Sequence, residues 1–343
     1  MRLRRSDIHA PGIVRRRCGR GFSYTTAQGK PVIDGSTLER IRALAIPPAW
    51  RKVWICPHPN GHIQATGRDS AGRRQYLYHD QWRTERDEEK FDRVLDLAGH
   101  LPRMRDAVRA DLAQRGFSEH RVLAVAIALL DSGAFRVGNE EYADTNGTYG
   151  VATLLRDHVQ VSGEQISFAF PAKGGAQRQA TIEDMLLAKA IQGLRRSSAP
   201  AARLLVCREV GGFRPIRAED INVRFRELTG PEFSVKDLRT WQATVLAAVD
   251  FVTCECPESA RARRAVVRRV MTDVSQVLGN TAAVARESYV DPRVVHAFEH
   301  GATVAAAMRK AQRSESATGQ RTIIDAAVAR LIHRAERGIR SAG

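Results

Sequence analysis

The sequence has few acids for its number of bases. Its 54 lysine and arginine residues exceed its 38 aspartate and glutamate residues, which gives a formal net charge of +16. Such a surface attracts polyanions; nucleic acid is the commonest polyanionic partner, and an anionic membrane surface is the rival. Because the sequence contains no run of about 18 apolar residues and no secretory signal, we predict a cytoplasmic protein without a membrane partner.

Cysteine is also scarce. An odd number of cysteines scattered over 343 residues argues against a disulfide framework, so we expect reduced thiols. One residue separates Cys254 from Cys256, and Cys56, His58 and His62 lack a clearly spaced fourth ligand. We therefore predict no metal site. The sequence also has no Gly-x-x-x-x-Gly-Lys-Ser/Thr loop for a nucleotide, and we predict no cofactor.

The length predicts two domains, because 343 residues exceed what one hydrophobic core usually organises. Residues 1–20 hold seven arginines and one acid, which predicts a flexible basic arm. Residues 21–88 contain short alternating segments between turn residues, and we predict a small β domain there. From residue 89 to 343 the apolar spacing becomes helical, which predicts a larger, mainly helical domain. The fold class is therefore α+β.

A few strands interrupt the helical pattern of the second domain. Segments 158–161, 165–170 and 177–182 alternate apolar and polar residues, which predicts a small three-stranded sheet with Lys173 at the tip of a β-hairpin. Ser234, followed three residues later by Asp237, resembles a helix capping box. This pattern places Arg239 in the first turns of a helix, where free backbone amides favour a phosphate neighbour.

Five polar residues follow one another along this domain in a distinctive order: Arg136, Lys173, Arg239, Asn280 and Tyr289. A tyrosine hydroxyl has a pKa near 10, and the charge of a DNA backbone opposes its attack on a phosphodiester. Guanidinium groups match the nonbridging phosphate oxygens and favour a more highly charged transition state. The order of these residues therefore suggests phosphoryl transfer onto a tyrosine.

The motifs around these residues resemble those of type IB DNA topoisomerases of the poxvirus and bacterial kind. In the second domain the resemblance lies in Arg136 to Tyr142, Lys236 to Trp241, the Lys173 turn and Asn280 to Tyr289. In the first domain it lies in Ile46 to Trp50, Gly61 to Gly67 and Gly72 to Tyr78. The resemblance implies an enzyme that acts as a monomeric clamp around duplex DNA and is associated with the bacterial nucleoid. It also implies relaxation of supercoils without ATP or metal, through a 3′-phosphotyrosyl intermediate.

The resemblance assigns Tyr289 as the nucleophile, with Arg136, Lys173, Arg239 and Asn280 assisting. Lys173 is our candidate acid for the departing 5′ oxygen, and phosphate binding without proton transfer is the alternative. Asn280 replaces the histidine of many relatives; since an amide cannot titrate, it should donate a hydrogen bond to a phosphate oxygen.

The resemblance places Gln75, Tyr76 and Tyr78 in a DNA groove. The alternative is that the two tyrosines cover a hydrophobic core.

Two other functions compete with this interpretation. A tyrosine site-specific recombinase uses an analogous set of residues, but the resemblance of the first domain disfavours it. A noncatalytic DNA-binding protein would explain the basic charge and would leave the order of the five residues unexplained.

Overall fold

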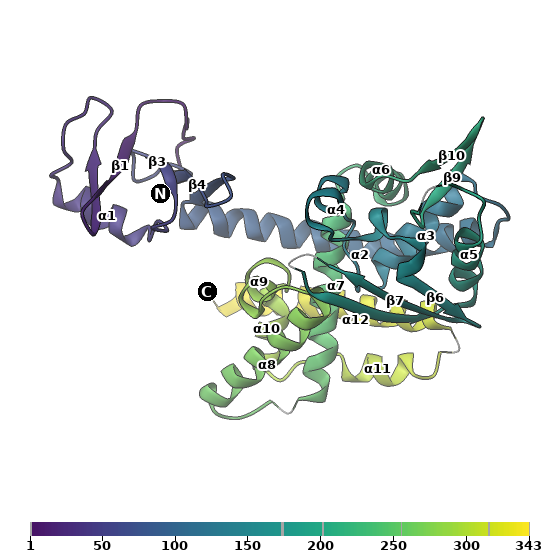
Figure 1. Cartoon of the computed structure of the whole chain (residues 1–343). Helices are drawn as coiled ribbons and strands as arrows, with labels where there is room; N and C mark the ends of the chain where they lie inside the picture. Colours follow the sequence, from purple (N-terminus) through teal and green to yellow (C-terminus); the bar gives the residue numbers. More distant parts are fainter. Residues whose placement is uncertain (1, 173–174, 201, 255, 315, 343) are drawn as a thin grey trace. The chain divides into compact units, whose positions relative to one another are not determined.

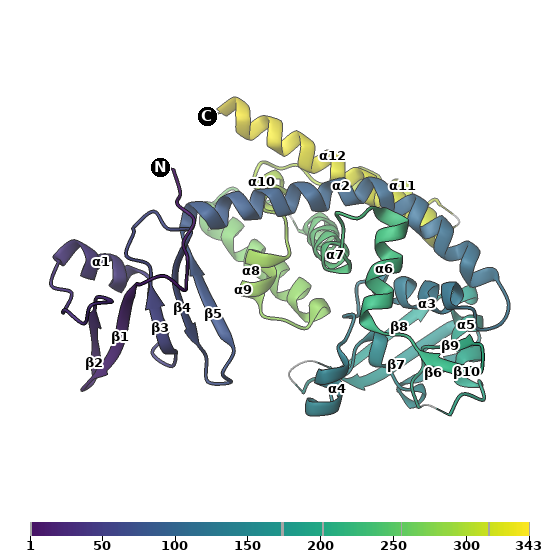
Figure 2. The ribbon, with the colours of Figure 1, turned by 90° about the horizontal axis from the view of Figure 1, so that it is seen from above.

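The computed structural model describes residues 2–172, 175–200, 202–254, 256–314 and 316–342, which form two compact units, Met1–Lys90 and Phe91–Gly343 (Figure 1). The first unit is a sheet domain. Its elements are β1 (Ile13–Cys18), β2 (Gly21–Thr25), α1 (Gly35–Ala43), β3 (Arg51–Ile55), β4 (Ile63–Arg68) and β5 (Arg74–Tyr78). The strands form one antiparallel sheet in the order β2-β1-β3-β4-β5 (Figure 2).

The prediction that residues 1–20 form a flexible arm is wrong, because β1 pairs with both β2 and β3. Ile13 is buried in the core of the sheet. Arg15 is also buried and donates hydrogen bonds to the backbone oxygens of Ile46 (3.0 Å), Pro47 (3.0 Å) and Trp50 (2.8 Å). These three acceptors satisfy a charge that would otherwise stay in water. The basic composition of residues 1–20 gives no indication that one of their arginines is buried.

The same contacts give the motif at Ile46 to Trp50 a structural role, because Arg15 donates hydrogen bonds to three of its carbonyl groups. Trp50 packs against Gly67 of β4. A Cβ atom at Gly67 would lie 2.8 Å from the Trp50 ring, closer than a real contact allows. The glycine is therefore required for the close approach of the Trp50 ring to β4.

Helix α2 (Asp80–Ala113) leads into the second unit, where it packs in a core of helices. The helices there are α3 (Glu119–Asp131), α4 (Glu140–Asn146), α5 (Met185–Arg195), α6 (Ala218–Thr229), α7 (Val235–Asp250), α8 (Ala260–Leu278), α9 (Ala282–Ser288), α10 (Pro292–Glu299), α11 (Ala305–Ala311) and α12 (Ala317–Ala342). Short 3-10 turns occupy Val151–Thr153, Arg156–His158 and Phe251–Thr253.

Two small sheets lie beside these helices. The antiparallel strands β6 (Val159–Ser162), β7 (Gln165–Pro171) and β8 (Gln177–Glu183) form one sheet, and β9 (Val206–Glu209) pairs with β10 (Gly212–Pro215) in the other. The α+β fold class is thus confirmed, with a sheet domain followed by a larger helical domain that includes a three-stranded sheet. Among the described residues, no helix is long and apolar enough to span a membrane.

A buried ionic network joins α12 to α2, α3 and α7. Arg105 of α2 contacts Asp131 of α3 (2.9 Å) and Asp325 of α12 (2.6 Å). Asp325 also accepts a hydrogen bond of 3.0 Å from the indole nitrogen of Trp241 in α7. Burial alone would raise the pKa of Asp131, but the charges of Arg321 and Arg105 outweigh it and lower the pKa overall. This contribution to stability is therefore present above about pH 4 and is lost as the pH falls through the lowered pKa.

Replacing Asp325 with alanine should lower the free energy of unfolding by about 2–3 kcal/mol, because it removes a buried charged acceptor from both Arg105 and Trp241. Urea unfolding at pH 7 measures the change. Asp273→Ala is the matched control, since its pair with Arg269 is exposed and such pairs contribute about 0–1 kcal/mol. Equal stability of the two variants would show that the network does not hold α12.

Candidate active site

Arg136 lies in a loop whose backbone conformation depends on two neighbouring glycines, Gly138 and Gly150. Its carbonyl oxygen accepts a hydrogen bond of 2.9 Å from the amide of Val151. Gly138 has a φ of 88°, a conformation that favours glycine, and a Cβ on Gly150 would lie 2.5 Å from the Gly138 backbone. The two backbone segments can approach only because both residues lack a side chain. Gly138, from the Arg-Val-Gly motif, therefore helps to position Arg136.

Arg239 lies in the first turns of α7, as the capping-box pattern predicts. The Asp237 carboxylate accepts hydrogen bonds from the Ser234 amide (3.0 Å) and hydroxyl (2.7 Å) at the start of this helix. The Arg239 guanidinium donates to the carbonyl oxygens of Phe135, at 3.1 Å, and Leu278. It therefore joins α7 to the loop that precedes Arg136 and to the end of α8.

The C-terminus of α8 brings the two predicted arginines together. Arg136 donates to the carbonyl oxygens of Leu278 (3.3 Å) and Gly279 (2.6 Å), and Arg239 also donates to Leu278. The last carbonyl groups of a helix have no partner within it and carry partial negative charge. The two guanidinium groups therefore cap α8 beside Asn280.

A third arginine, Arg178 of β8, joins this cluster. Its guanidinium donates to the carbonyl oxygens of Ala134 (3.1 Å), Gln276 (3.1 Å) and Val277. Several other arginines form ion pairs with carboxylates. Among the described residues, no carboxylate forms such a pair with Arg136, Arg178 or Arg239. The cluster is thus a concentration of positive charge, which backbone oxygens and the Tyr289 phenol offset in the described part of the chain.

The pKa values of two of these arginines reflect that concentration. Burial, followed by the charge of Arg136, lowers the pKa of Arg239 to about 10, and the Tyr289 phenol opposes this shift. Burial and the charge of Arg136 also lower the pKa of Arg178. Both groups stay protonated at neutral pH. An anion that entered the cluster would relieve the repulsion between these charges.

Tyr289 ends α9 and is half-buried next to Arg239, whose guanidinium carbon lies 5.7 Å from the centroid of the phenol ring. Thr244 of α7 fixes its backbone. The Thr244 hydroxyl lies 3.3 Å from the Tyr289 carbonyl oxygen and accepts a hydrogen bond of 3.1 Å from the Asp291 amide. The predicted nucleophile and one predicted arginine are therefore held by the same helix.

Asn280 follows α8, and its side chain has no hydrogen-bond partner among the described residues. Both its amide nitrogen and its amide oxygen are buried, and neither forms a hydrogen bond with the described part of the chain. A buried polar group without a partner costs free energy, so such a group in a folded protein calls for an explanation. A phosphate oxygen that accepted a hydrogen bond from the amide nitrogen would supply one.

The remaining predicted residue of this set, Lys173, lies outside the described residues, although β7 and β8 on either side of it form the expected hairpin. A hollow of about 200 Å³ opens next to that hairpin. Arg136, Tyr149, Phe170, Arg178, Leu278 and Gly279 are among the residues that line it. Arg136 and Arg178 belong to the arginine cluster, so the hollow has a positive lining that suits an anionic group.

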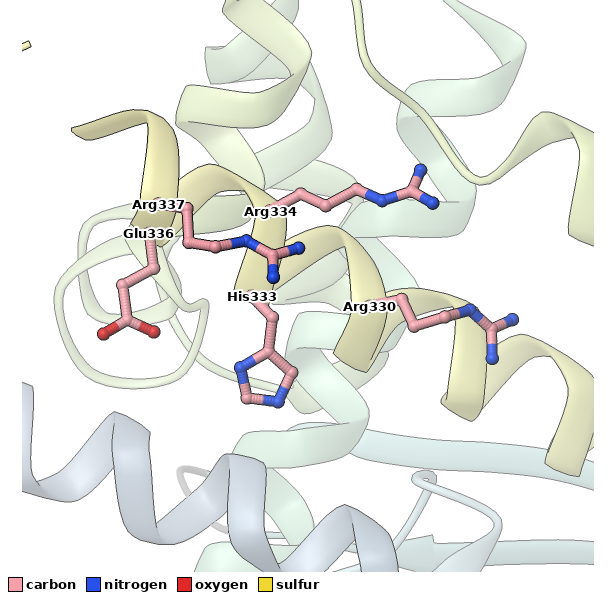
Figure 3. Close-up of a pocket in the computed structure, with 5 residues that line it drawn as sticks. All are labelled: Arg330, His333, Arg334, Glu336 and Arg337. Atoms are coloured by element: carbon pink, nitrogen blue, oxygen red, sulfur yellow. The ribbon is translucent and has the colours of Figure 1, made fainter. Parts of the chain in front are cut away.

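A larger hollow of about 470 Å³ lies elsewhere, along α12 (Figure 3). Its lining consists of Arg330, His333, Arg334, Glu336 and Arg337, whose side chains project from successive turns of the helix. It contains none of the five residues predicted for phosphoryl transfer. The cluster at the end of α8 is therefore the better candidate site, although its hollow is smaller.

The first unit contains the three residues predicted to bind DNA. Tyr76 and Tyr78 lie on the edge strand β5, are 38% and 39% exposed, and stack with ring centroids 6.0 Å apart. They do not cover a hydrophobic core, which removes that alternative. Side chains alternate along a strand, so Gln75 points to the other face, where its amide donates to Asp69 at 2.9 Å. Arg74, which sequence reasoning missed, is exposed on the same face as the tyrosines.

Comparison with known proteins identifies the family. Residues 79–315 match the model of the eukaryotic DNA topoisomerase I catalytic core, and residues 21–69 match that of the bacterial DNA topoisomerase IB N-terminal domain. The chain belongs to the type IB DNA topoisomerase family, whose members are isomerases that act on DNA.

Three relatives illustrate the range of this similarity. DNA topoisomerase 1B of Acanthamoeba polyphaga mimivirus is 29% identical over 81% of this chain and 85% of its own length. DNA topoisomerase 1B of vaccinia virus (strain Copenhagen) is 22% identical over 65% of this chain and 68% of its own length. DNA topoisomerase 1 alpha of Arabidopsis thaliana is 27% identical over 46% of this chain and 16% of its own length.

Proposed function

We propose that this protein relaxes supercoiled DNA by cutting and resealing one strand through a covalent bond to Tyr289. The observation that supports this most strongly is the convergence of Arg136 and Arg239 on the end of α8, next to the Tyr289 ring and the Asn280 amide, which has no partner among the described residues. A phenol, two planar cations and a hydrogen-bond donor thus lie around one position. That combination suits a phosphodiester in an in-line displacement.

The proposed reaction begins with attack of the Tyr289 phenolic oxygen on the phosphorus of a DNA phosphodiester, and the phenolic proton passes to solvent. A phosphorus–oxygen bond forms to the tyrosine and the bond to the 5′ oxygen breaks, which leaves a 3′-phosphotyrosyl link. Arg136, Arg239 and the amide of Asn280 stabilise the extra charge of the transition state. The 5′ oxygen is a much stronger base than phenolate and needs a proton, and Lys173 remains our candidate acid.

The covalent intermediate retains the energy of the phosphodiester, so the reverse reaction reseals the strand without ATP. Charge stabilisation by arginines likewise gives the proposed chemistry no need for a metal. Rotation of the DNA while the strand is open would release superhelical strain. We further propose that a single copy of the chain closes around the duplex as a clamp in the bacterial cytoplasm, with Tyr76 and Tyr78 approaching a groove.

Incubation with supercoiled plasmid in EDTA, without nucleotide, tests this proposal. We expect complete relaxation of a plasmid that carries no particular pair of sites, at a rate proportional to protein concentration. Dependence on a defined pair of sites and on an oligomer would favour a tyrosine recombinase instead. Binding without any change of topology would indicate a noncatalytic DNA-binding protein.

A further inference from the structure

Arg178 and Arg136 form a ring of hydrogen bonds and backbone that links the loop of Arg136 to the end of α8. From β8 its guanidinium reaches Ala134, two residues before Arg136, and also the carbonyl groups of Gln276 and Val277 at the end of α8. Arg136 completes the ring by donating to the two residues that follow, Leu278 and Gly279. The ring therefore fixes the loop of Arg136 against the segment that leads into Asn280.

The two arginines differ in how their donors are used. All three guanidinium nitrogens of Arg178 donate to backbone oxygens. In the described part of the structure, Arg136 donates through Nη2 alone, which leaves Nε and Nη1 available for a phosphate. Arg178 is thus occupied within the fold, whereas Arg136 retains two guanidinium nitrogens that donate to none of the described residues.

The position of Arg178 on β8 also indicates that its side chain serves the fold, in contrast to that of Arg136. It pairs across the sheet with Phe170, which is buried and stacks on Phe135. Residues that face each other across a sheet have neighbouring side chains on one face. The stem of Arg178 therefore starts from the packed face of the hairpin, and the guanidinium extends from there to α8.

We propose that Arg178 is a positioning residue for cleavage, which acts by holding Arg136 and Asn280 in register around the reacting phosphate. This inference rests on the proposed function of the site. A displacement of about 1 Å in a group that contacts the transition state can lower a rate by about 10²-fold. The α8 carbonyl groups that Arg178 contacts lie at the surface, where water can replace the lost hydrogen bonds. The effect on the reaction should therefore exceed the effect on stability.

The test compares Arg178→Ala, Arg178→Lys and wild type in single turnover, with protein in excess over supercoiled plasmid and the covalent adduct trapped by detergent. We expect Arg178→Ala to lower the rate of adduct formation by about 10²-fold at saturating protein. The DNA dissociation constant should stay close to that of wild type. Lysine keeps the charge but cannot span three carbonyl groups, so it should restore only part of the rate.

A double-mutant cycle shows whether Arg178 acts through Arg136. If it does, adding Arg178→Ala to Arg136→Ala should cost far less than the same change costs in wild type. Arg208→Ala, which removes an exposed arginine from β9, is the charge-matched control and should react as wild type does.

Three results would overturn the inference: an unchanged rate in Arg178→Ala, fully additive effects in the cycle, or a loss confined to DNA affinity. Failure of wild type itself to form an adduct would instead reject the proposed function. The two failures are thus distinguishable.

Discussion

Tyr289→Phe should abolish both relaxation and covalent adduct formation while DNA binding is retained. Phenylalanine keeps the ring next to Arg239 and removes only the oxygen that forms the bond to phosphorus. Removal of a catalytic nucleophile lowers rates by about 10⁶-fold in a well-studied protease, so a loss of at least about 10⁴-fold is expected here. Plasmid relaxation over a wide range of protein concentration measures the loss, and a mobility shift measures binding.

Tyr149→Phe is the matched control for this substitution. Tyr149 lines the hollow near Arg136 and is half-buried, like Tyr289, but the proposed chemistry does not use its hydroxyl. The control should relax plasmid at a rate within about tenfold of wild type, in keeping with the loss of at most one ordinary hydrogen bond. Residual relaxation by Tyr289→Phe at the level of this control would assign the nucleophile to another residue.

Arg239→Ala should give the next largest effect, a fall of about 10²- to 10³-fold in the rate of adduct formation. The change removes a cation that lies over the Tyr289 ring, together with its hydrogen bonds to the carbonyl groups of Phe135 and Leu278, the second of which still accepts from Arg136. Lysine at this position keeps the charge but loses the planar fork, so Arg239→Lys should recover only part of the rate. Single-turnover trapping of the adduct on plasmid DNA measures both variants.

Arg334→Ala provides the comparison for Arg239, because it removes an exposed arginine from α12, outside the cluster. Its rate should match wild type. If Arg239→Ala loses DNA affinity but reaches the wild-type rate at saturation, Arg239 serves binding and not the transition state. That outcome would leave Arg136 and Asn280 as the groups that stabilise the charge.

Much of the fold follows from local patterns in the sequence. Alternation at 75–78 predicts the strand that forms β5, and the Ser234 and Asp237 pattern predicts the start of α7. Arg136, Arg239, Asn280 and Tyr289 also meet at one place in the structure, although 153 positions separate the first from the last. Their roles in catalysis remain predictions.

Features that depend on tertiary contacts escape such reasoning. Arg15 looks like one more base in a solvated arm, but it lies in β1, which pairs with β2 and β3, and three carbonyl groups from the segment at 46–50 accept its hydrogen bonds. Arg178 and Thr244 likewise have no distinguishing sequence signal, since each is defined by contacts with residues 44 or more positions away. Helix α9, at seven residues, is too short to produce a clear period.

The segment beyond Phe298 contributes to the catalytic region through the buried network. Asp325 of α12 contacts both Arg105 and Trp241, and Trp241 lies two residues after Arg239 in α7. Asp131 of the same network lies at the end of α3, five residues before Arg136. Helix α12 therefore contacts α7, which contains Arg239, and is linked through Arg105 to the end of α3, which precedes Arg136.

The most direct test of the account is to identify the residue that becomes attached to DNA. The protein is incubated with supercoiled plasmid, denatured to trap the adduct, and digested with nuclease and trypsin for mass spectrometry. We expect a nucleotide linked through its 3′ phosphate to Tyr289, in the tryptic peptide of residues 287–293. Attachment to another residue, linkage through a 5′ phosphate, or active relaxation without any adduct would contradict it.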